Sequence, residues 1–411
     1  MRTITRSIFF VLLVMCVSLF AVSCSHTDSK LPADTTVPSE NNTTSDDSLD
    51  TTPPLITETD TSSPDFDSDS TAAADTTAAD TADSDTSEGS EALDVPSYLN
   101  PLTGLPVNKD LSAFRPAAIM VNNIAVSCPQ PGIASADIIY ECLVEGGFTR
   151  LMAVSMDYTN LPVIGSVRSA RHYYLAMAAD YDALFIHIGG STYAFDTIDE
   201  KGVNNVNGIE WYASNYVYWQ DPVRLKNMGY EHSWLTNGES IAEGIKYKRY
   251  RTAARANFDY PVDFVEYGTT VSYENKAEHV HIPYSRLQTT DFVYDDESKT
   301  YLRYQFNGQK HIDGTTGEQL AFDNVIVYYC ETGLITNDAL NRIDVQTEGT
   351  GTGFYATKGT YIPITWEKDS FESPIRFYTA DGEPLYLNVG KTFISVCPTS
   401  IKNDVSLNYE W

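Results

Sequence analysis

Apolar residues are distributed unevenly along the chain, in three stretches with different patterns. A continuous apolar run covers residues 8–22 and follows a short basic start at Arg2 and Arg6. Residues 25–95 then contain almost only Thr, Ser, Asp, Ala and Pro. From residue 96 onward, short apolar runs alternate with turn residues, as they do in folded regions. The three patterns predict an export signal, a disordered segment and a globular part.

The first half of the globular part mixes predicted strands and helices. Residues 117–121 (AAIMV) form a short apolar run, which predicts a buried strand. Residues 137–145 and 148–156 predict a hairpin, because Gly146-Gly147 suits a two-residue turn between strand-forming runs. The same region contains two helical patterns and one more strand pattern, at residues 167–181, 239–248 and 184–188 respectively.

Past residue 260 the pattern is almost entirely strand and turn. Apolar runs are separated by turn signals such as Asn307-Gly308 and Asp381-Gly382, which suits an antiparallel sheet or a small barrel. A chain of this size exceeds one compact core, so two domains are expected. We therefore predict an α+β fold with a signal peptide (1–23), a disordered acidic tether (24–95), a mixed α/β N-terminal domain (96–260) and a mainly antiparallel-β C-terminal domain (261–411).

Cys24 follows the apolar run directly. Residues 21–24 (AVSC) resemble a bacterial lipobox, in which the cysteine becomes the lipidated first residue of the mature protein, although Ala21 stands where Leu is usual. The apolar run has 15 residues, fewer than the roughly 20 that a membrane-spanning helix needs. We predict lipidation of Cys24 and anchoring at the extracytoplasmic face of the cell membrane. An ordinary signal peptide or an uncleaved anchor is the alternative.

Charge separates the tether from the globular part. Residues 25–95 contain 18 acidic residues and one basic residue, Lys30, so we interpret them as an extended spacer without a binding role. Residues 96–411 contain 24 basic and 38 acidic residues. This balance argues against nucleic acid or an anionic bilayer as a general partner of the globular part.

The cysteines and histidines give weak signals for metal binding. The four cysteines of the globular part have no tight spacing, which argues against a structural zinc site. Cys330 and Cys397 lie in apolar runs and are predicted to be buried free thiols, with a disulfide between them as the alternative. His279 and His281 share one strand face but have no third ligand nearby in the sequence. No metal and no cofactor are predicted.

Several motifs resemble those of the YerB-like bacterial lipoproteins. Phe393 stands where that family tends to have Trp, and Ser233 stands where Asn is expected after the histidine. The resemblance implies a bacterial lipoprotein with two paired domains of unknown function, and it implies no established reaction. The motifs are RPAAIMVNN (115–123), SADIIYE (135–141), VEGGFTR (144–150), GSVRSAR (165–171), GTGFY (351–355) and GKTFISVCP (390–398).

The GSVRSAR motif and the histidine after it contain the first candidate site residues. Ser166 is predicted to cap a helix, with Arg168 in its first turn and Arg171 and His172 on the same side. Two arginines so close to a helix N-terminus oppose the helix dipole. An anion held by both guanidinium groups would remove this conflict. Ion pairs with protein carboxylates are the alternative.

The predicted hairpin contains two acidic residues. Glu141 and Glu145 share a strand face about 13 Å apart, farther than the roughly 5–9.5 Å between the paired carboxylates of glycosidases. A two-residue turn would place Arg150 opposite Leu143 and diagonal to both carboxylates. We therefore predict an ion-pair cluster of Glu141, Arg150 and Glu145, with Glu145 as a lone general acid as the catalytic alternative.

The segment 219–224 (WQDPVR) and His232 complete the candidate site. Their polar and aromatic residues follow neither helical nor strand spacing, which predicts a binding loop, although His232 also fits a hydrogen-bonded core position. We predict a non-catalytic lipoprotein that binds an anionic cell-envelope glycan or peptide. An envelope hydrolase using Glu145 or His232, or a scaffold for a membrane-bound enzyme, is the alternative. The predicted ligand-binding residues are Arg168, Arg171, His172, Arg224 and His232.

Overall fold

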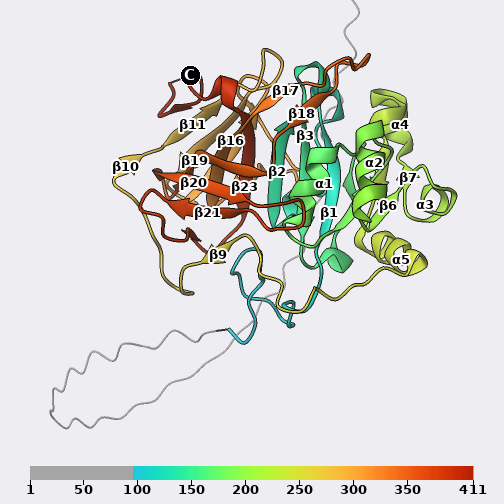
Figure 1. The fold of residues 1–411 in the computed structure, drawn as a ribbon, viewed down its shortest axis with the longest axis horizontal. Helices are drawn as coiled ribbons and strands as arrows, with labels where there is room; N and C mark the ends of the chain where they lie inside the picture. The colour runs from blue at the N-terminus through green and yellow to red at the C-terminus, as the bar shows by residue number, and fades with distance from the viewer. Residues whose placement is uncertain (1–95, 411) are drawn as a thin grey trace, which may run out of the picture. The chain divides into compact units, whose positions relative to one another are not determined.

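The computed structural model describes residues 96–410, which form an α+β fold around one long mixed sheet (Figure 1). The first half mixes helices and strands and the second half consists mainly of strands, as the sequence predicts. The predicted lipidation site Cys24 and the predicted tether lie outside the described residues. The α-helices of this part are α1 (His172–Ala179), α2 (Thr192–Lys201), α3 (Trp211–Tyr216), α4 (Pro222–Met228) and α5 (Gly238–Lys248).

The central sheet takes strands from both halves of the chain. Its order is β10-β20-β19-β16-β23-β2-β3-β1-β5-β6, and β21 pairs with β20. Strands β2 and β23 are parallel neighbours, so segments from opposite ends of the described chain lie side by side. The strands are β1 (Ala117–Asn123), β2 (Ile138–Leu143), β3 (Thr149–Ser155), β5 (Leu184–His187), β6 (Asn205–Asn207), β10 (Asn275–Lys276), β16 (Asn324–Cys330), β19 (Gly349–Thr357), β20 (Thr360–Lys368), β21 (Arg376–Thr379) and β23 (Thr392–Pro398).

Three neighbouring strands of this sheet, β1, β5 and β6, run parallel. Their carboxyl ends meet at one edge of the sheet, around Asn122, Gly189 and Asn207, and we call this the carboxyl edge. Their amino ends meet at the opposite edge, where Arg115 precedes β1 and Asp182 precedes β5, and we call this the amino edge.

The central strands are buried on both faces. Every residue of β1 is buried, and alternate residues enter different cores: Met120 packs with α1, whereas Ile119 packs with the core that contains Ile241 of α5. A strand covered on both faces has a continuous apolar sequence instead of an alternating one. This explains why residues 117–121 could be predicted as a strand.

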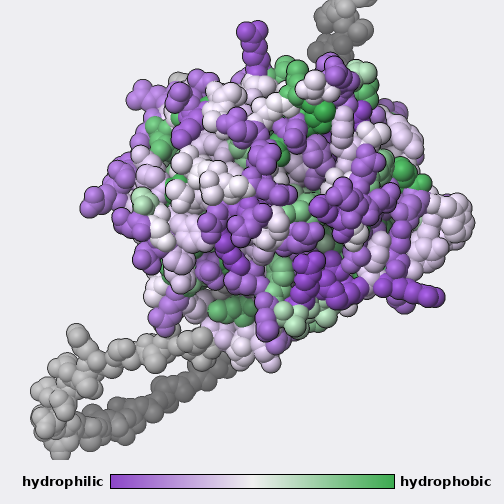
Figure 2. Space-filling model, in the orientation of Figure 1, coloured by the Kyte–Doolittle hydropathy of each residue, from purple (hydrophilic) through white to green (hydrophobic). Residues whose placement is uncertain are grey.

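A second, antiparallel sheet and several short sheets complete the second half and the loops. On the face drawn in Figure 2, apolar residues form small separate patches among polar residues. The second sheet contains β11 (His279–Ile282), β12 (Thr290–Asp295), β13 (Thr300–Gln305), β14 (Gln309–Lys310), β15 (Ala321–Phe322) and β24 (Ser406–Leu407). The short sheets pair β4 (Ile164–Gly165), β7 (Trp219–Gln220) and β8 (Trp234–Thr236), then β17 (Thr332–Leu334) and β18 (Ile343–Val345), then β9 (Asp263–Phe264) and β22 (Tyr386–Leu387).

The helix predicted at residues 167–181 is shorter than expected. Helix α1 begins at His172, its N-cap position is Arg171, and Ser166 does not cap it. The preceding segment is extended instead, because its backbone bonds to neighbouring strands: Arg168 N donates to Met120 O at 2.9 Å. The prediction that Arg168 lies in the first turn of a helix is therefore wrong.

The hairpin of β2 and β3 has a different register from the predicted one. Cys142 lies opposite Arg150, and a five-residue loop replaces the two-residue turn. A shift of one residue moves a side chain to the other face of the sheet, so Arg150 and Glu141 face opposite sides. The predicted cluster of Glu141, Arg150 and Glu145 is wrong. Glu141 instead forms a fully buried ion pair of 2.8 Å with Arg303 of β13.

Two smaller expectations are also resolved, and one finding concerns the helices of the described residues. Residues 219–224 are not an irregular loop, because they form β7 and the start of α4, whose N-cap Asp221 accepts a hydrogen bond from Arg224 N at 2.7 Å. Cys330 and Cys397 are buried free thiols, as predicted. Within residues 96–410, no helix is both long and apolar enough to cross a membrane.

Candidate functional site

The segment 166–171 runs along the carboxyl edge of the parallel strands. Val167 bridges Val121 at the end of β1, and Ala170 N donates to Gly189 O beyond the end of β5 at 2.9 Å. Strand β3 begins at the same edge, where Arg150 lies opposite Asn122. The backbone therefore brings the side chains of Arg150, Arg168 and Arg171 to one place, and we call these three the carboxyl-edge arginines.

Arg171 is held firmly by Glu145. Its Nε and Nη2 atoms each lie 2.6 Å from one oxygen of the Glu145 carboxylate, which is a two-pronged ion pair. Burial alone would raise the pKa of Glu145, but the hydrogen bonds and the charge of Arg171 outweigh burial and bring the pKa below its ordinary value. Glu145 is therefore ionised at neutral pH.

Arg168 is held more loosely. Its Nη2 atom lies 3.0 Å from the carboxylate of Glu231, but the Glu231 side chain is 67% exposed and can move into solvent. The Arg168 Nε atom is buried and has no hydrogen-bond partner among residues 96–410. Arg168 Nη1 also donates to the backbone carbonyl of Glu231 at 3.3 Å, so the only carboxylate that pairs with Arg168 within residues 96–410 belongs to an exposed side chain.

Arg150 has no carboxylate of its own. Its Nη1 atom donates to the carbonyl oxygen of Ser169 at 2.6 Å, and no carboxylate of the described residues lies within 4.0 Å. Burial, followed by the charges of Arg171 and Arg168, lowers the pKa of Arg150 to about 9, so it is still charged at neutral pH. The site thus has three arginines and two carboxylates.

His232 lies beside Arg168. Its Nδ1 atom is 2.8 Å from the amide nitrogen of Asn122, which donates, so Nδ1 accepts and Nε2 carries the proton of the neutral ring. Burial, then the charge of Arg168, lowers the pKa of His232. The Nε2–H of the neutral ring has no hydrogen-bond partner within residues 96–410, so it can donate to an oxygen of a ligand.

The other two predicted residues have different surroundings. The buried Arg224 donates to the backbone carbonyls of Ser127, Pro129 and His232 at 2.6, 3.0 and 2.9 Å, so it positions His232. His172 Nε2 lies 2.8 Å from the carboxylate of Asp344 on β18. The structure therefore brings together Arg168, Arg171 and His232, with Glu145 beside Arg171, while ligand binding by any of them stays a prediction.

Sequence reasoning missed Arg150, Asn122 and Glu231 as members of this site. Arg150 was assigned to the wrong face of β3 because the loop length was wrong. Asn122 ends the apolar run of β1, and two asparagines at the end of a buried strand were a usable signal. Glu231 precedes His232 in the sequence and carries no pattern that would connect it with Arg168.

Comparison with known proteins agrees with the motifs. The family model described as "Protein of unknown function (DUF3048) N-terminal domain" matches residues 102–251, and the model of the corresponding C-terminal domain matches residues 280–394. The chain is 28% identical to "Putative lipoprotein YerB" of Bacillus subtilis (strain 168) over 303 residues, which cover 72% of this chain and 86% of that protein.

A solved structure supports the same assignment. The crystal structure of YerB protein from Bacillus subtilis matches with a TM-score of 0.64 and 25% identity, covering 76% of this chain and 99% of that chain. The two family models follow one another in the same order as the two halves of the fold. The chain therefore belongs to the YerB-like family, whose paired domains have no established function.

Proposed function

We propose that this protein is a membrane-anchored lipoprotein of the extracytoplasmic face, and that it binds an anionic group of the cell envelope at the carboxyl-edge arginines. The observation that carries the proposal is the unmatched charge. Three guanidinium groups lie together with two carboxylates, and Arg150 is buried without a carboxylate partner among the described residues.

An anionic ligand would satisfy this arrangement. A carboxylate or phosphate oxygen that replaces Glu231 would accept from Arg168 and from the Nε2–H of His232. It would also reduce the repulsion between Arg168 and Arg150, which contributes to the lowered pKa of Arg150. The binding free energy is most favourable where the ligand accepts from both Arg168 and His232, because salt screens charge-assisted hydrogen bonds only weakly in a half-buried site.

The hydrolase alternative has less support at this site. A general acid at neutral pH needs a carboxyl group with a raised pKa, whereas the pKa of Glu145 is lowered by its pairing with Arg171. The scaffold alternative needs a broad apolar docking surface. The separate apolar patches in Figure 2 do not provide one on that face.

Two observations support the proposed anchoring, one from the sequence before Cys24 and one from the name of the Bacillus relative. The lipobox-like residues before Cys24 and the name of the Bacillus protein, "Putative lipoprotein YerB", both support a lipid attached to Cys24. Replacing Cys24 by Ala should move the protein from the membrane fraction to the soluble fraction. Unchanged membrane retention of Cys24→Ala would contradict the anchor.

Binding can be tested with soluble muropeptides, which carry free carboxylates, titrated into the full chain in detergent. Arg168→Gln should weaken binding about tenfold, since it removes a charge-assisted hydrogen bond. Glu231→Gln should tighten binding, because the competing carboxylate is gone. Both substitutions change exposed or loosely held side chains, so the melting temperature should stay nearly constant.

Arg286→Gln is the matched control. Arg286 is an exposed arginine of the second half that makes no ion pair with the described residues, so its loss changes net charge equally without touching the site. Equal binding by the wild-type protein, Arg168→Gln and Arg286→Gln would show that the muropeptides do not use the carboxyl-edge arginines.

A further inference from the structure

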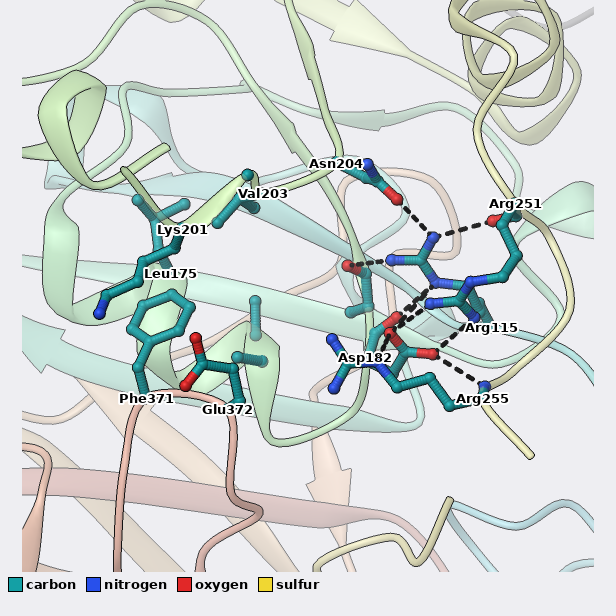
Figure 3. A pocket seen from close by; sticks show the side chains of 14 residues that line it. Arg115, Leu175, Asp182, Lys201, Val203, Asn204, Arg251, Arg255, Phe371 and Glu372 are labelled. Atoms are coloured by element: carbon teal, nitrogen blue, oxygen red, sulfur yellow. Dashed lines mark hydrogen bonds and ion pairs between the residues drawn. The ribbon is translucent and has the colours of Figure 1, made fainter. Parts of the chain in front are cut away.

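A second group of basic residues surrounds a pocket at the amino edge of the same strands (Figure 3). The pocket is open to solvent and has a cavity volume of about 80 Å³. Its floor is apolar and includes Leu175 of α1 and the ring of Phe371. Its charged lining residues are Arg115, Lys201, Arg251, Arg255, Asp182 and Glu372.

Two of the arginines hold the pocket together. The buried Arg115 donates to the carbonyl of Asp182 at 2.6 Å, to Asn204 Oδ1 at 2.8 Å and to the carbonyl of Arg251 at 2.8 Å. Arg251 binds both oxygens of the Asp182 carboxylate, at 2.7 and 2.8 Å. These side chains are therefore occupied by the protein itself.

Arg255 and Lys201 are not occupied in this way. The backbone N–H of Arg255 donates to Asp182 Oδ2 at 3.1 Å, whereas its side chain reaches Asp182 through Nε, at 3.5 Å, and is 54% exposed. Its two Nη atoms have no hydrogen-bond partner within residues 96–410, and in Figure 3 they point toward the side of the pocket formed by Phe371 and Glu372. Lys201 Nζ lies 3.5 Å from the exposed Glu200 and 5.8 Å from the Phe371 ring, and in Figure 3 its side chain extends past that ring on the side away from Arg255.

The charge of the lining is opposite to that of the rest of the globular part. Four basic residues meet two acidic residues here, whereas residues 96–411 contain 24 basic and 38 acidic residues. A locally positive pocket concentrates anions of matching charge. The two Nη atoms of Arg255, which have no hydrogen-bond partner within residues 96–410, form a planar fork that suits two oxygens of a phosphate group.

We propose that this pocket binds the phosphate group of a phosphoester, with the two Nη atoms of Arg255 as its donors, the nearby positive charge of Lys201 adding to the attraction, and the apolar floor against the carbon chain of the ester. The phosphoester is either a soluble molecule or the headgroup of a phospholipid, since both present the same group. The site is separate from the carboxyl-edge arginines, and the inference does not depend on the function proposed for them.

The test is calorimetric titration of glycerol 3-phosphate into the full chain in detergent micelles. We expect saturable binding that weakens about tenfold or more in the Lys201→Gln, Arg255→Gln double variant, since the charge-assisted contact of Arg255 and the nearby charge of Lys201 are both lost. Arg168→Gln and Arg286→Gln should bind as the wild-type protein does. The double variant should keep its melting temperature, because Arg115 and Arg251 still neutralise Asp182.

Several outcomes separate the possibilities. Competition by phosphatidylglycerol in the micelles, and not by phosphatidylcholine, would identify a lipid headgroup as the source of the phosphate, and absence of competition would identify a soluble phosphoester. Wild-type binding that the double variant retains would overturn the proposal, as would equal affinity for succinate. If the double variant does not fold, the Lys201→Gln single variant is titrated instead, because the Lys201 side chain does not contact Asp182.

Discussion

At the two edges of the parallel strands β1, β5 and β6, the charges of the arginines are neutralised in different ways. At the amino edge, three arginines share the single carboxylate of Asp182, whose side chain is 2% exposed. At the carboxyl edge, Arg171 and Arg168 have one carboxylate each, and the carboxylate of Glu231 lies on the surface. The first arrangement centres on a buried anion and the second on a buried cation, Arg150.

This difference indicates which groups serve stability and which are available to a ligand. A buried carboxylate surrounded by arginines cannot be removed without leaving unpaired charges in the interior. An exposed carboxylate can be replaced by solvent or by a ligand at little cost in stability. Asp182 is accordingly structural, whereas Glu231 occupies a position that another anion can take.

The largest expected effect comes from removing the carboxylate of Asp182, which the three amino-edge arginines share. Asp182→Asn leaves Arg115 buried with its neutralising partner gone, and we expect a loss of about 3–5 kcal/mol in the free energy of unfolding. Glu231→Gln is the matched change at the other edge and should cost less than about 1 kcal/mol. Urea denaturation of both variants measures the difference. Similar small losses would show that the two edges are equivalent.

The next test compares two of the carboxyl-edge arginines, Arg171 and Arg168. Arg171→Gln leaves the half-buried carboxylate of Glu145 without its two-pronged partner, so stability should fall by about 1.5–3 kcal/mol. Arg168→Gln should change stability by less than about 1 kcal/mol. Thermal and urea unfolding of the two single variants give the comparison. A larger loss for Arg168→Gln would mean that Glu231 holds Arg168 more firmly than its exposure indicates.

The smallest effect concerns pH, because among the described residues a histidine lies beside Arg168 at the carboxyl edge and none lines the amino-edge pocket. Folding lowers the pKa of His232 through burial and the charge of Arg168, with Arg224 adding to the effect and Glu231 opposing it. A bound anion raises that pKa again, so the complex holds more protons than the free protein. Sulfate binding at this edge should therefore strengthen as pH falls from about 7 to 5.

The control for this pH dependence is the His232→Gln variant of the same protein. Sulfate keeps its charge over this range, and His232→Gln should remove the trend without removing binding. Sulfate bound at the amino-edge pocket should show no such trend, because no histidine lines that pocket among the described residues. A pH trend that survives in His232→Gln would assign the titration to another group.

Elements with strong local patterns could be predicted from the sequence, whereas most contacts that build the two sites could not. Buried strands such as 117–121 and 325–329 are continuous apolar runs, so their type was evident. The start of α1 was missed because residues 166–171 bond to distant strands, which local spacing does not encode. Asp182 and Arg251 are far apart in the sequence, and nothing local connects them.

The hairpin shows how one local error changes the chemistry of a site. The loop between β2 and β3 is three residues longer than a two-residue turn, and this alone turned Arg150 from a partner of Glu141 into a member of another cluster. The true partner of Glu141 is Arg303, which only the assembled fold brings near.

The parallel pairing of β2 with β23 also sets an order of events during synthesis. A growing chain emerges from its N-terminus, so β1, β2 and β3 can associate while residues 392–398 do not yet exist. Until then β2 has one open side whose backbone N–H and C=O groups lack partners and can attract strands of other chains. Pairing between such distant segments is slow. Residues 392–398 therefore act as a closing strand, because their pairing covers the side of β2 that is open until they are made.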